Sequence, residues 1–267
     1  MEEFSVIEDT LFVPMLGRIY CSEHFPRILK DEKALEISKK LPASLKGQDT
    51  QTQYTLMASA VRSLNMDRYI HKFMEDNPDG VVVLLGCGLE TTWYRCDNGK
   101  TVFYEVDLPD VIQYRRQILG ETERDICIAG DAFGEEWIKK VRKDHENAPV
   151  LVAASGLFYY FEEKKVLDLF RNLKKYGNIQ LLFDTVNKSG MKRMSHYMKQ
   201  VGHEEASMYF YVDQGRDLAE KIGGLLLSEE PYYAHTDKKG LKFMTSLTMK
   251  ISDKLRMVKM LHLQLNG

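Results

Sequence analysis

The feature that most constrains this chain is an apolar run that ends at a pair of glycines. Residues 81–85, VVVLL, contain no polar side chain, which is typical of a central strand buried on both faces. The run stops at Gly86-Cys87-Gly88, where two glycines let the backbone turn tightly and approach a ligand closely. The next residues can begin a helix whose first N–H groups face that ligand. This arrangement predicts a site for a nucleotide-like cofactor.

Beyond the turn, apolar runs alternate with helical patterns in the βαβ manner. The predicted strands are 81–85, 101–106, 125–129, 150–154 and 179–183, and the predicted helices are 108–119, 133–143, 162–176 and 187–201. Residues 225–227 and 260–265 predict a closing hairpin around a basic, largely helical stretch, 238–259. We therefore expect an α/β fold with a doubly wound, mostly parallel, Rossmann-like sheet and an antiparallel C-terminal hairpin. Ligands of such sheets bind beyond the carboxyl ends of the strands.

The first part of the chain has a different pattern. Residues 12–77 are helical in pattern and show no strand-like alternation, and Pro14, Pro26 and Pro42 are expected to mark boundaries. We expect a helical N-terminal cap, residues 1–78, packed on a core formed by residues 79–267 as one compact unit.

Composition excludes several classes of protein. The formal net charge of −2 gives no reason to expect nucleic acid or an anionic membrane as a partner. The N-terminus is acidic where a signal peptide is basic, and no apolar run approaches the roughly 20 residues that span a bilayer. Four cysteines without CxxC spacing are typical of free thiols in a reducing compartment, namely Cys21, Cys87, Cys96 and Cys127. We expect a cytoplasmic protein.

The glycine turn lacks one element of the dinucleotide-binding fingerprint. Thr91 stands where the third glycine of that fingerprint is expected, so a pyrophosphate would lose close helix packing there. S-adenosylmethionine has no phosphate and needs only close approach of the backbone, so the turn favours this cofactor. An antiparallel closing hairpin also suits a methyltransferase sheet better than a dinucleotide-binding one. An ordinary strand-to-helix turn remains the alternative.

Acidic residues follow the next two predicted strands. Asp107 lies about twenty positions after Gly88, the spacing at which a carboxylate binds ribose hydroxyls, and Glu105 on the same face could serve instead. Asp107 could also cap the next helix. Asp131, with the N–H group of Ala132, could bind adenine, and capping a helix is again the alternative.

The loop after the fourth predicted strand, ASGLFYYF, is rich in aromatic residues. In a class I methyltransferase this loop lies at the reactive methyl group, where aromatic faces surround the sulfonium and exclude water. A role in the core is the competing interpretation. Buried tyrosine hydroxyls need partners, so we expect Tyr160 to face a polar ligand. No histidine has metal-ligand spacing and there is no HExxH or GxSxG motif, so we expect no metal.

Taken together, these motifs resemble the family that includes leucine carboxyl methyltransferase and the tetracenomycin polyketide O-methyltransferase. The matching segments are 62–67, GCGLETT, YEVDLPDVI, GDA and SGLFYYF. The resemblance implies a class I S-adenosylmethionine fold with a helical N-terminal cap. It implies that Arg62 pairs with the methionine carboxylate, a sensible role for a guanidinium, which can grip a carboxylate with two hydrogen bonds.

The resemblance also assigns the other cofactor-binding positions. It implies that Gly86, Cys87 and Gly88 approach the cofactor, that Asp107 binds ribose, that Asp131 with Ala132 reads adenine, and that Ser155 lies nearby. One position departs from the family, which often has Glu where this chain has Ser155. That departure argues against transferring the identity of a relative's substrate.

These observations predict an enzyme, an S-adenosylmethionine-dependent O-methyltransferase acting on a carboxylate or hydroxyl of a small molecule or peptide. A carboxylate is ionised at neutral pH and needs no base, whereas a phenol does. Arg18 and Tyr20 in the cap are candidates, with Tyr160, for positioning the acceptor. The alternatives are a nicotinamide-dependent oxidoreductase and a non-catalytic S-adenosylmethionine-binding protein. The sequence does not indicate the oligomeric state.

Overall fold

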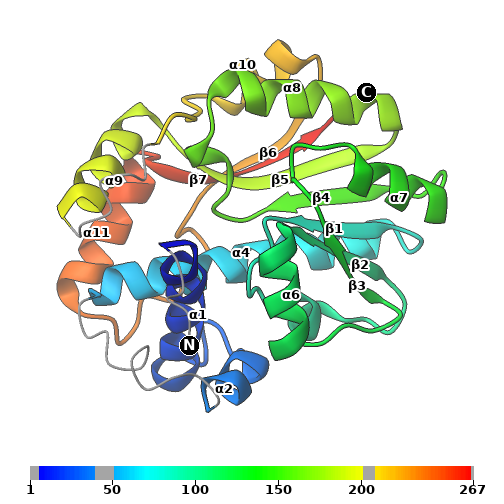
Figure 1. Ribbon diagram of the computed structural model, residues 1–267. Helices are drawn as coiled ribbons and strands as arrows, with labels where there is room; N and C mark the ends of the chain where they lie inside the picture. Colours follow the sequence, from blue (N-terminus) through cyan, green and yellow to red (C-terminus); the bar gives the residue numbers. More distant parts are fainter. Residues whose placement is uncertain (1–5, 40–50, 201–207, 266–267) are drawn as a thin grey trace.

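The structure is a computed structural model that describes residues 6–39, 51–200 and 208–265. At its centre is a seven-stranded sheet with the order β3-β2-β1-β4-β5-β7-β6 (Figure 1). In chain order the strands are β1 (Val81–Leu85), β2 (Val102–Asp107), β3 (Asp125–Ala129), β4 (Val150–Ala154), β5 (Ile179–Val186), β6 (Leu225–Pro231) and β7 (Val258–Gln264). Strands β1 to β5 pair in parallel, and β7 runs antiparallel to both β5 and β6. The expected sheet and closing hairpin are confirmed.

Helices cover both faces of this sheet. On one face, alternate residues of the strands pack on α7 (Glu136–Asp144), α8 (Glu163–Leu173) and α10 (Gly215–Ile222). On the other, the opposite set packs on α4 (Gln53–Asp76), α6 (Pro109–Ile118) and α11 (Phe243–Lys254). All five residues of β1 are buried, as expected for a central strand between two helical layers. Among the helices of the described ranges, none combines the length and apolar character that crossing a bilayer requires.

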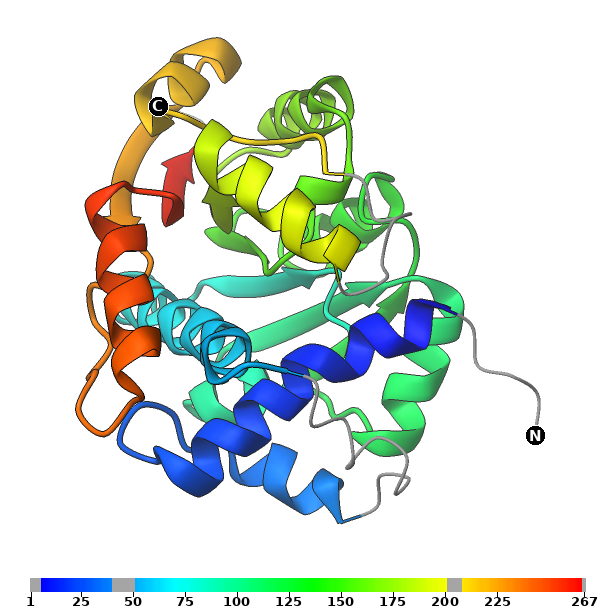
Figure 2. The same ribbon diagram turned by 90° about the vertical axis from the view of Figure 1, so that its left-hand side faces the viewer.

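The N-terminal region is helical, as predicted. It consists of α1 (Val6–His24), α2 (Glu32–Ser38) and α4, and α1 crosses the front of the molecule in Figure 2 with its N-terminal end towards α6. The predicted boundary at Pro14 is wrong, because α1 continues through this residue at the cost of one backbone hydrogen bond. Pro42 lies outside the described residues. Helix α4 shares the core of the sheet, and the division after residue 78 remains a prediction.

Some helix boundaries differ from those predicted. Helix α7 begins at Glu136 rather than at residue 133, because Asp131 and Gly134 first form a turn. The helix predicted over 187–201 is α9 (Lys188–Gln200), and position 201 lies outside the described residues. Residues 162–176 form α8 and a 3-10 turn, η2 (Lys174–Tyr176). The sequence patterns did not predict α10.

The crossing of α1 and α4 depends on a glycine. A Cβ atom on Gly17 would lie 2.5 Å from the carbonyl oxygen of Leu56 and 2.6 Å from Cβ of Ser59. Helix axes can approach this closely only where one helix has no side chain.

We predict that Gly17→Ala lowers the free energy of unfolding by about 1–3 kcal/mol, because the methyl group meets backbone that cannot rotate away. Urea denaturation measures the change. The matched control is Gly130→Ala, where the added Cβ has no neighbour within 4 Å. Equal stabilities of the two variants would show that the crossing tolerates a wider separation.

Candidate functional site

The predicted glycine turn has the expected strained backbone. Gly86 has φ +63° and Gly88 has φ +48°, a region that side-chain-bearing residues rarely adopt. A Cβ atom on Gly86 would lie 2.9 Å from Cδ1 of Leu157, and one on Gly88 would lie 3.1 Å from Cδ2 of Leu11. Both positions therefore favour glycine for conformation, and an added Cβ at either would push against the end of a leucine side chain.

The N–H groups of this turn are bonded within the protein. Gly86 and Cys87 both donate to the carbonyl of Val106, at 2.8 and 3.2 Å, and Gly88 donates to Oδ2 of Asp107 at 2.8 Å. The helix expected directly after the turn is instead a short one, α5 (Thr92–Cys96), that begins four residues later. The turn thus offers close backbone approach without a set of free donors for a phosphate.

Asp107 lies against this turn, as its spacing predicted. Its Oδ2 accepts from Gly88 and its Oδ1 accepts from the N–H of Leu108, both at 2.8 Å, and its burial raises the carboxyl pKa. Carboxylate oxygens keep further lone pairs for ligand hydroxyls. Glu105, the other carboxylate considered, is fully buried and pairs with Arg115 at 3.0 Å. Only Asp107 of these two is partly exposed.

The next strand brings Asp131 and Ala132 to the same edge of the sheet. The last residue of β3, Ala129, pairs in register with Asp107. Asp131 is exposed, and its Oδ1 accepts from the N–H of Phe133 at 2.9 Å, so it caps a turn rather than the helix. Ala132 is buried and its carbonyl accepts from the indole N–H of Trp137.

On the other side of β1, the loop after β4 is held by a buried aspartate. Asp184 in β5 accepts from Nε of Arg62 at 2.8 Å, from the N–H of Gly156 at 2.7 Å and from the hydroxyl of Tyr159. Ser155 precedes this glycine and is partly exposed. Sequence reasoning missed Asp184, and the available signal was a charged residue directly after the apolar run Leu181–Phe183.

Gly156 and Arg62 are in close contact. Gly156 has φ +69°, and a Cβ atom there would lie 2.7 Å from Nη1 of Arg62. One edge of the guanidinium is thus bound by Asp184 while the other faces the loop after β4.

The aromatic loop is divided between core and surface. Phe158 and Tyr159 are buried, and Phe158 packs edge to face on Phe170 and Phe183. Tyr160 is 41% exposed and remains a candidate for contact with the acceptor. The core interpretation therefore fits part of this loop.

The two candidates for positioning the acceptor that come from the cap, Arg18 and Tyr20, both contact other groups of the protein. All three guanidinium nitrogens of Arg18, which is fully buried, bind protein groups: Nε pairs with Asp31 and Nη1 with Glu90, each at 3.0 Å, and Nη2 donates to the carbonyl of Leu89 at 2.7 Å. The hydroxyl of Tyr20 accepts from Gln53 at 3.1 Å. These contacts favour a structural role for Arg18.

A second buried arginine, not predicted as important, completes this network. Arg95 pairs with Asp31 at 2.7 Å, with Asp67 at 2.7 Å and with Glu90 at 2.9 Å. Burial alone would raise the pKa of Glu90, but the guanidinium groups of Arg18 and Arg95 lower it to about 2. The network ties α1, α2 and α4 to Glu90, the second residue after the glycine turn.

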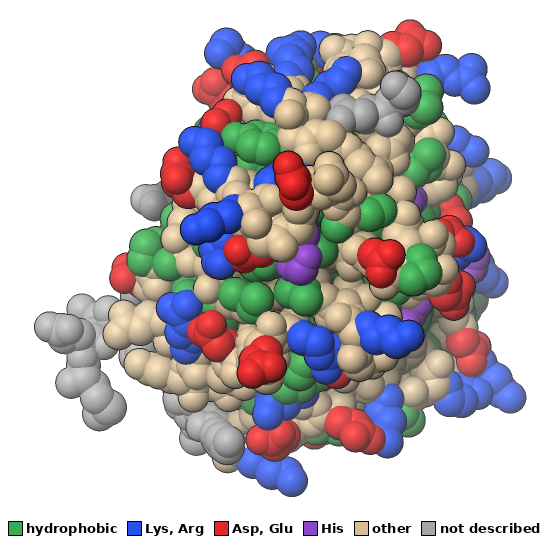
Figure 3. Space-filling model, turned by 90° about the vertical axis from the view of Figure 1, so that its right-hand side faces the viewer, with side chains coloured by type: hydrophobic (Ala, Val, Ile, Leu, Met, Phe, Trp, Pro, Cys, Tyr) green, Lys and Arg blue, Asp and Glu red, His purple; other side chains and the backbone are tan. Residues whose placement is uncertain are grey.

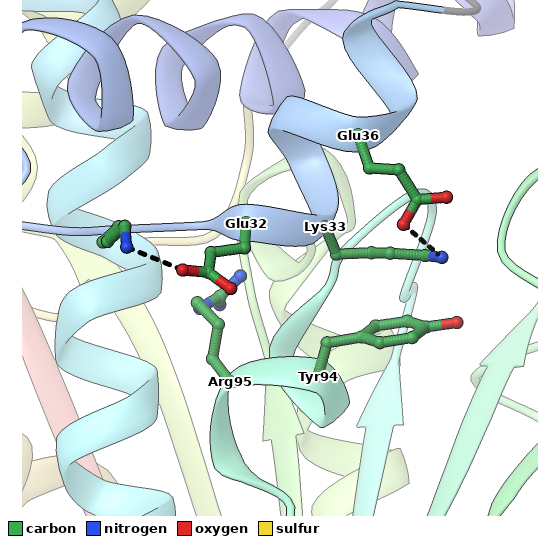
Figure 4. A pocket seen from close by; sticks show the side chains of 6 residues that line it. Glu32, Lys33, Glu36, Tyr94 and Arg95 are labelled. Atoms are coloured by element: carbon green, nitrogen blue, oxygen red, sulfur yellow. Dashed lines mark hydrogen bonds and ion pairs between the residues drawn. The ribbon is translucent and has the colours of Figure 1, made fainter.

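A separate hollow of about 430 Å³ lies between α2 and α5 (Figure 4). The ammonium group of Lys33 lies 4.9 Å from the ring centre of Tyr94 and pairs with Glu36, and Lys30 pairs with Glu32. None of the predicted cofactor residues lines this hollow, which is lined by Lys30, Glu32, Lys33, Glu36, Tyr94 and Arg95. This hollow is therefore separate from the predicted cofactor residues.

Potential metal ligands, surface charges and cysteines also bear on which ligand the chain could bind. In the part of the chain that the structure describes, no group of three or more His, Cys, Asp or Glu side chains is placed to hold a metal ion. On the face shown in Figure 3, acidic and basic side chains are interspersed. The four cysteines are free and buried.

Comparisons with known proteins identify the relatives of this chain. Residues 6–174 match the family model described as leucine carboxyl methyltransferase. The tetracenomycin polyketide synthesis O-methyltransferase TcmP of Streptomyces glaucescens is 25% identical over 226 residues, 84% of this chain and 82% of that protein.

Solved structures share the fold at low sequence identity. A DUF574 family protein from Streptomyces avermitilis aligns with a TM-score of 0.60 and 10% identity, over 95% of this chain and 99% of that one. Magnesium protoporphyrin IX methyltransferase from Synechocystis PCC 6803, solved with bound SAH, aligns with a TM-score of 0.50 and 10% identity, over 87% and 93%.

The contact between Gly156 and Arg62 gives a prediction. We expect Gly156→Ala to displace the guanidinium and to weaken binding of S-adenosylmethionine about tenfold or more, the effect of losing a hydrogen bond to a charged group. Isothermal titration calorimetry measures the affinity. Gly177→Ala is the matched control, because Gly177 has a similar φ of +66° but open space around its Cβ position. Both variants should lose about 1 kcal/mol of stability. Equal affinities would contradict the placement of Arg62.

Proposed function

This chain belongs to the leucine carboxyl methyltransferase family, and we propose that, as an S-adenosylmethionine-dependent methyltransferase, it transfers the methyl group to an oxygen of a small-molecule or peptide acceptor. Such a sulfonium cofactor supplies an electrophilic methyl group that a nucleophile displaces in line. The protein then has to align the acceptor with that methyl group and keep water away.

The observation that carries the assignment of the cofactor is the bonding of the glycine turn. Three successive N–H groups, those of Gly86, Cys87 and Gly88, are bonded to Val106 and Asp107, so the turn has few donors left for a pyrophosphate. A partly exposed carboxylate beside it repels a phosphate and attracts the hydroxyl groups of ribose. This geometry supports S-adenosylmethionine over a nicotinamide dinucleotide.

The proposed cofactor contacts follow from these positions. Gly86, Cys87 and Gly88 would approach the cofactor through their backbone, since the Cys87 side chain is buried in the core. Asp107 would bind ribose, and the turn at 131–132 would bind adenine. At the other end, Arg62 would bind the methionine carboxylate, and Ser155 would lie beside the methionine portion.

We propose that the acceptor enters beside Tyr160, the exposed member of the aromatic loop. A carboxylate acceptor is ionised at neutral pH and needs only positioning, whereas a hydroxyl must also lose its proton. TcmP, an O-methyltransferase, supports an oxygen acceptor. Ser155, where the family often has Glu, is a reason to test both kinds of acceptor.

Two broader assignments belong to the same proposal. The cap of residues 1–78 would cover the cofactor, since Leu11 of α1 lies over Gly88. Four free cysteines support a cytoplasmic enzyme.

The cofactor assignment predicts a simple binding result. We expect S-adenosylmethionine and S-adenosylhomocysteine to bind in calorimetry, and NAD to bind at least a hundredfold more weakly, because the turn lacks phosphate donors. Release of S-adenosylhomocysteine over a panel of carboxylic acids, phenols and peptides then tests turnover. Cofactor binding without turnover across the panel would favour a non-catalytic binding protein. Preferential binding of NAD would contradict the proposal.

The role of Asp107 predicts a selective loss of affinity. We expect Asp107→Asn to weaken binding of S-adenosylmethionine about 10- to 100-fold, because a charged acceptor for ribose is lost and one of its two backbone contacts with it. The control is Asp110→Asn, which removes an exposed acidic charge three residues later. An equal change in both variants would indicate a general electrostatic effect.

A further inference from the structure

A fully buried arginine lies behind the glycine turn. Arg115, in α6, donates through Nη1 to the carbonyl of Glu90 at 2.6 Å and to the carbonyl of Gly88 at 3.2 Å. Nothing in the sequence pattern singled out this residue. Its guanidinium reaches the two carbonyls on either side of Leu89, within the segment that forms the candidate cofactor site.

These contacts fix the peptide groups of Gly88 from two directions. The N–H of Gly88 donates to Asp107 on β2, while its carbonyl accepts from Arg115 on α6. A glycine with φ +48° has wide conformational freedom, so its orientation depends on such external bonds. Arg115 therefore restricts the part of the turn where close approach to a ligand is required.

Two buried carboxyl groups in turn face Arg115. Oε1 of Glu105 lies 3.0 Å from Nη2 of Arg115, and Asp125 at the start of β3 lies close enough to influence the charge of both groups. Among the described residues, no hydrogen-bond donor is bound to either carboxyl oxygen of Asp125. All three side chains are fully buried. Cys87, Cys127 and Tyr94 are further titratable groups around them. Nearby carboxylates also contribute to the local charge, namely Glu90, Asp97, Asp107 and Glu121.

A buried cluster of two carboxyl groups and one guanidinium requires one proton to be neutral. Two ionised carboxylates beside one guanidinium would leave an uncompensated negative charge in the core, which is strongly unfavourable. A proton shared between the two carboxyl groups removes that charge. Burial raises the pKa of Glu105 to about 8 and that of Asp125 to about 6, in agreement with a proton retained at neutral pH.

We propose that Arg115 is a positioning residue for the cofactor, which holds the carbonyls of Gly88 and Glu90 and is itself oriented by the proton-sharing pair Glu105 and Asp125. The inference rests on the proposed location of the cofactor at the glycine turn. Arg115 does not touch the cofactor, so its effect is on affinity through the shape of the turn.

The test compares two conservative exchanges of buried cations. Arg115→Lys keeps the charge but loses the planar fork that reaches two carbonyls, whereas Lys259→Arg alters a buried cation paired with Glu229 at 2.7 Å on the opposite side of the sheet. We expect Arg115→Lys to weaken binding of S-adenosylhomocysteine at least tenfold in calorimetry. Lys259→Arg should change the melting temperature and leave this affinity within twofold. A folded Arg115→Lys variant with affinity within twofold of the original chain overturns the proposal.

A second variant applies if Arg115→Lys does not fold. The double exchange Arg115→Met with Glu105→Gln removes the donor while keeping the cluster neutral, since Asp125 then holds the proton. It should fold and bind S-adenosylhomocysteine at least tenfold more weakly, and unchanged affinity overturns the proposal.

The proton shared by Glu105 and Asp125 is tested by the pH dependence of the folding equilibrium. The pKa of Glu105 is about 8 in the folded chain and about 4.3 in an unfolded one, so the folded state binds more protons between these values. Stability then falls as pH rises from about 5 to 8, by up to about tenfold in the folding equilibrium constant per pH unit. Glu105→Gln should remove this part of the pH dependence in denaturant titrations. An identical pH profile for the variant overturns the shared-proton part of the proposal.

These results also separate this inference from the proposed function. If the cofactor does not bind at the turn, Asp107→Asn leaves the affinity for S-adenosylhomocysteine unchanged. If only the role of Arg115 is mistaken, Asp107→Asn weakens binding and Arg115→Lys does not.

Discussion

The structure depends on a buried ion-pair network at Glu90, two residues after the glycine turn. Glu90 pairs with Arg18 of α1 and Arg95 of α5, and Asp31 before α2 pairs with the same two arginines. Removing charges from water is costly, so a buried network is tolerated only when each charge meets partners of opposite sign. Here Glu90 and Asp31 each meet two guanidinium groups, which ties the N-terminal helices to the glycine turn. A cap that could open freely would have to expose or unpair these charges.

This network is one of three constraints on the same short segment. The cap binds it at Glu90, β2 binds the N–H of Gly88 through Asp107, and α6 binds its carbonyl through Arg115. The residues come from elements on different sides of the turn, so no single element determines its shape. A sulfonium cofactor is already reactive, and the enzyme gains most by holding its binding surface rigid before the cofactor arrives. Buried charges around a flexible glycine turn achieve this preorganisation.

Sequence patterns predicted the sheet well, because apolar runs between turn residues report directly on burial. The strand 81–85 and the strands over 125–129 and 150–154 have the predicted bounds, and the closing hairpin was expected. The position of Asp107 at the end of a predicted strand also predicted its location beside the glycine turn. The buried charges were not predictable in this way. Arg18 is predicted only as a candidate for positioning the acceptor, and its buried partners were not predicted. The partners of Arg115 and Asp184 were also not predicted, because they lie many positions away in the chain and periodicity gives no information on such pairs.

Asp184 links the segment that the family model matches to the part of the chain that follows it. The family model matches residues 6–174, and this aspartate lies beyond that range, in β5. It nevertheless binds Arg62 and the N–H of Gly156, both of which lie within the match. Tyr159 donates to the same carboxylate, and Tyr160 beside it is exposed towards the proposed acceptor. If Arg62 and Tyr160 have the proposed roles, a change near β5 that moves Asp184 alters the methionine end of the cofactor site and the acceptor side together. The proposed roles therefore couple substrate specificity to cofactor position through this one carboxylate.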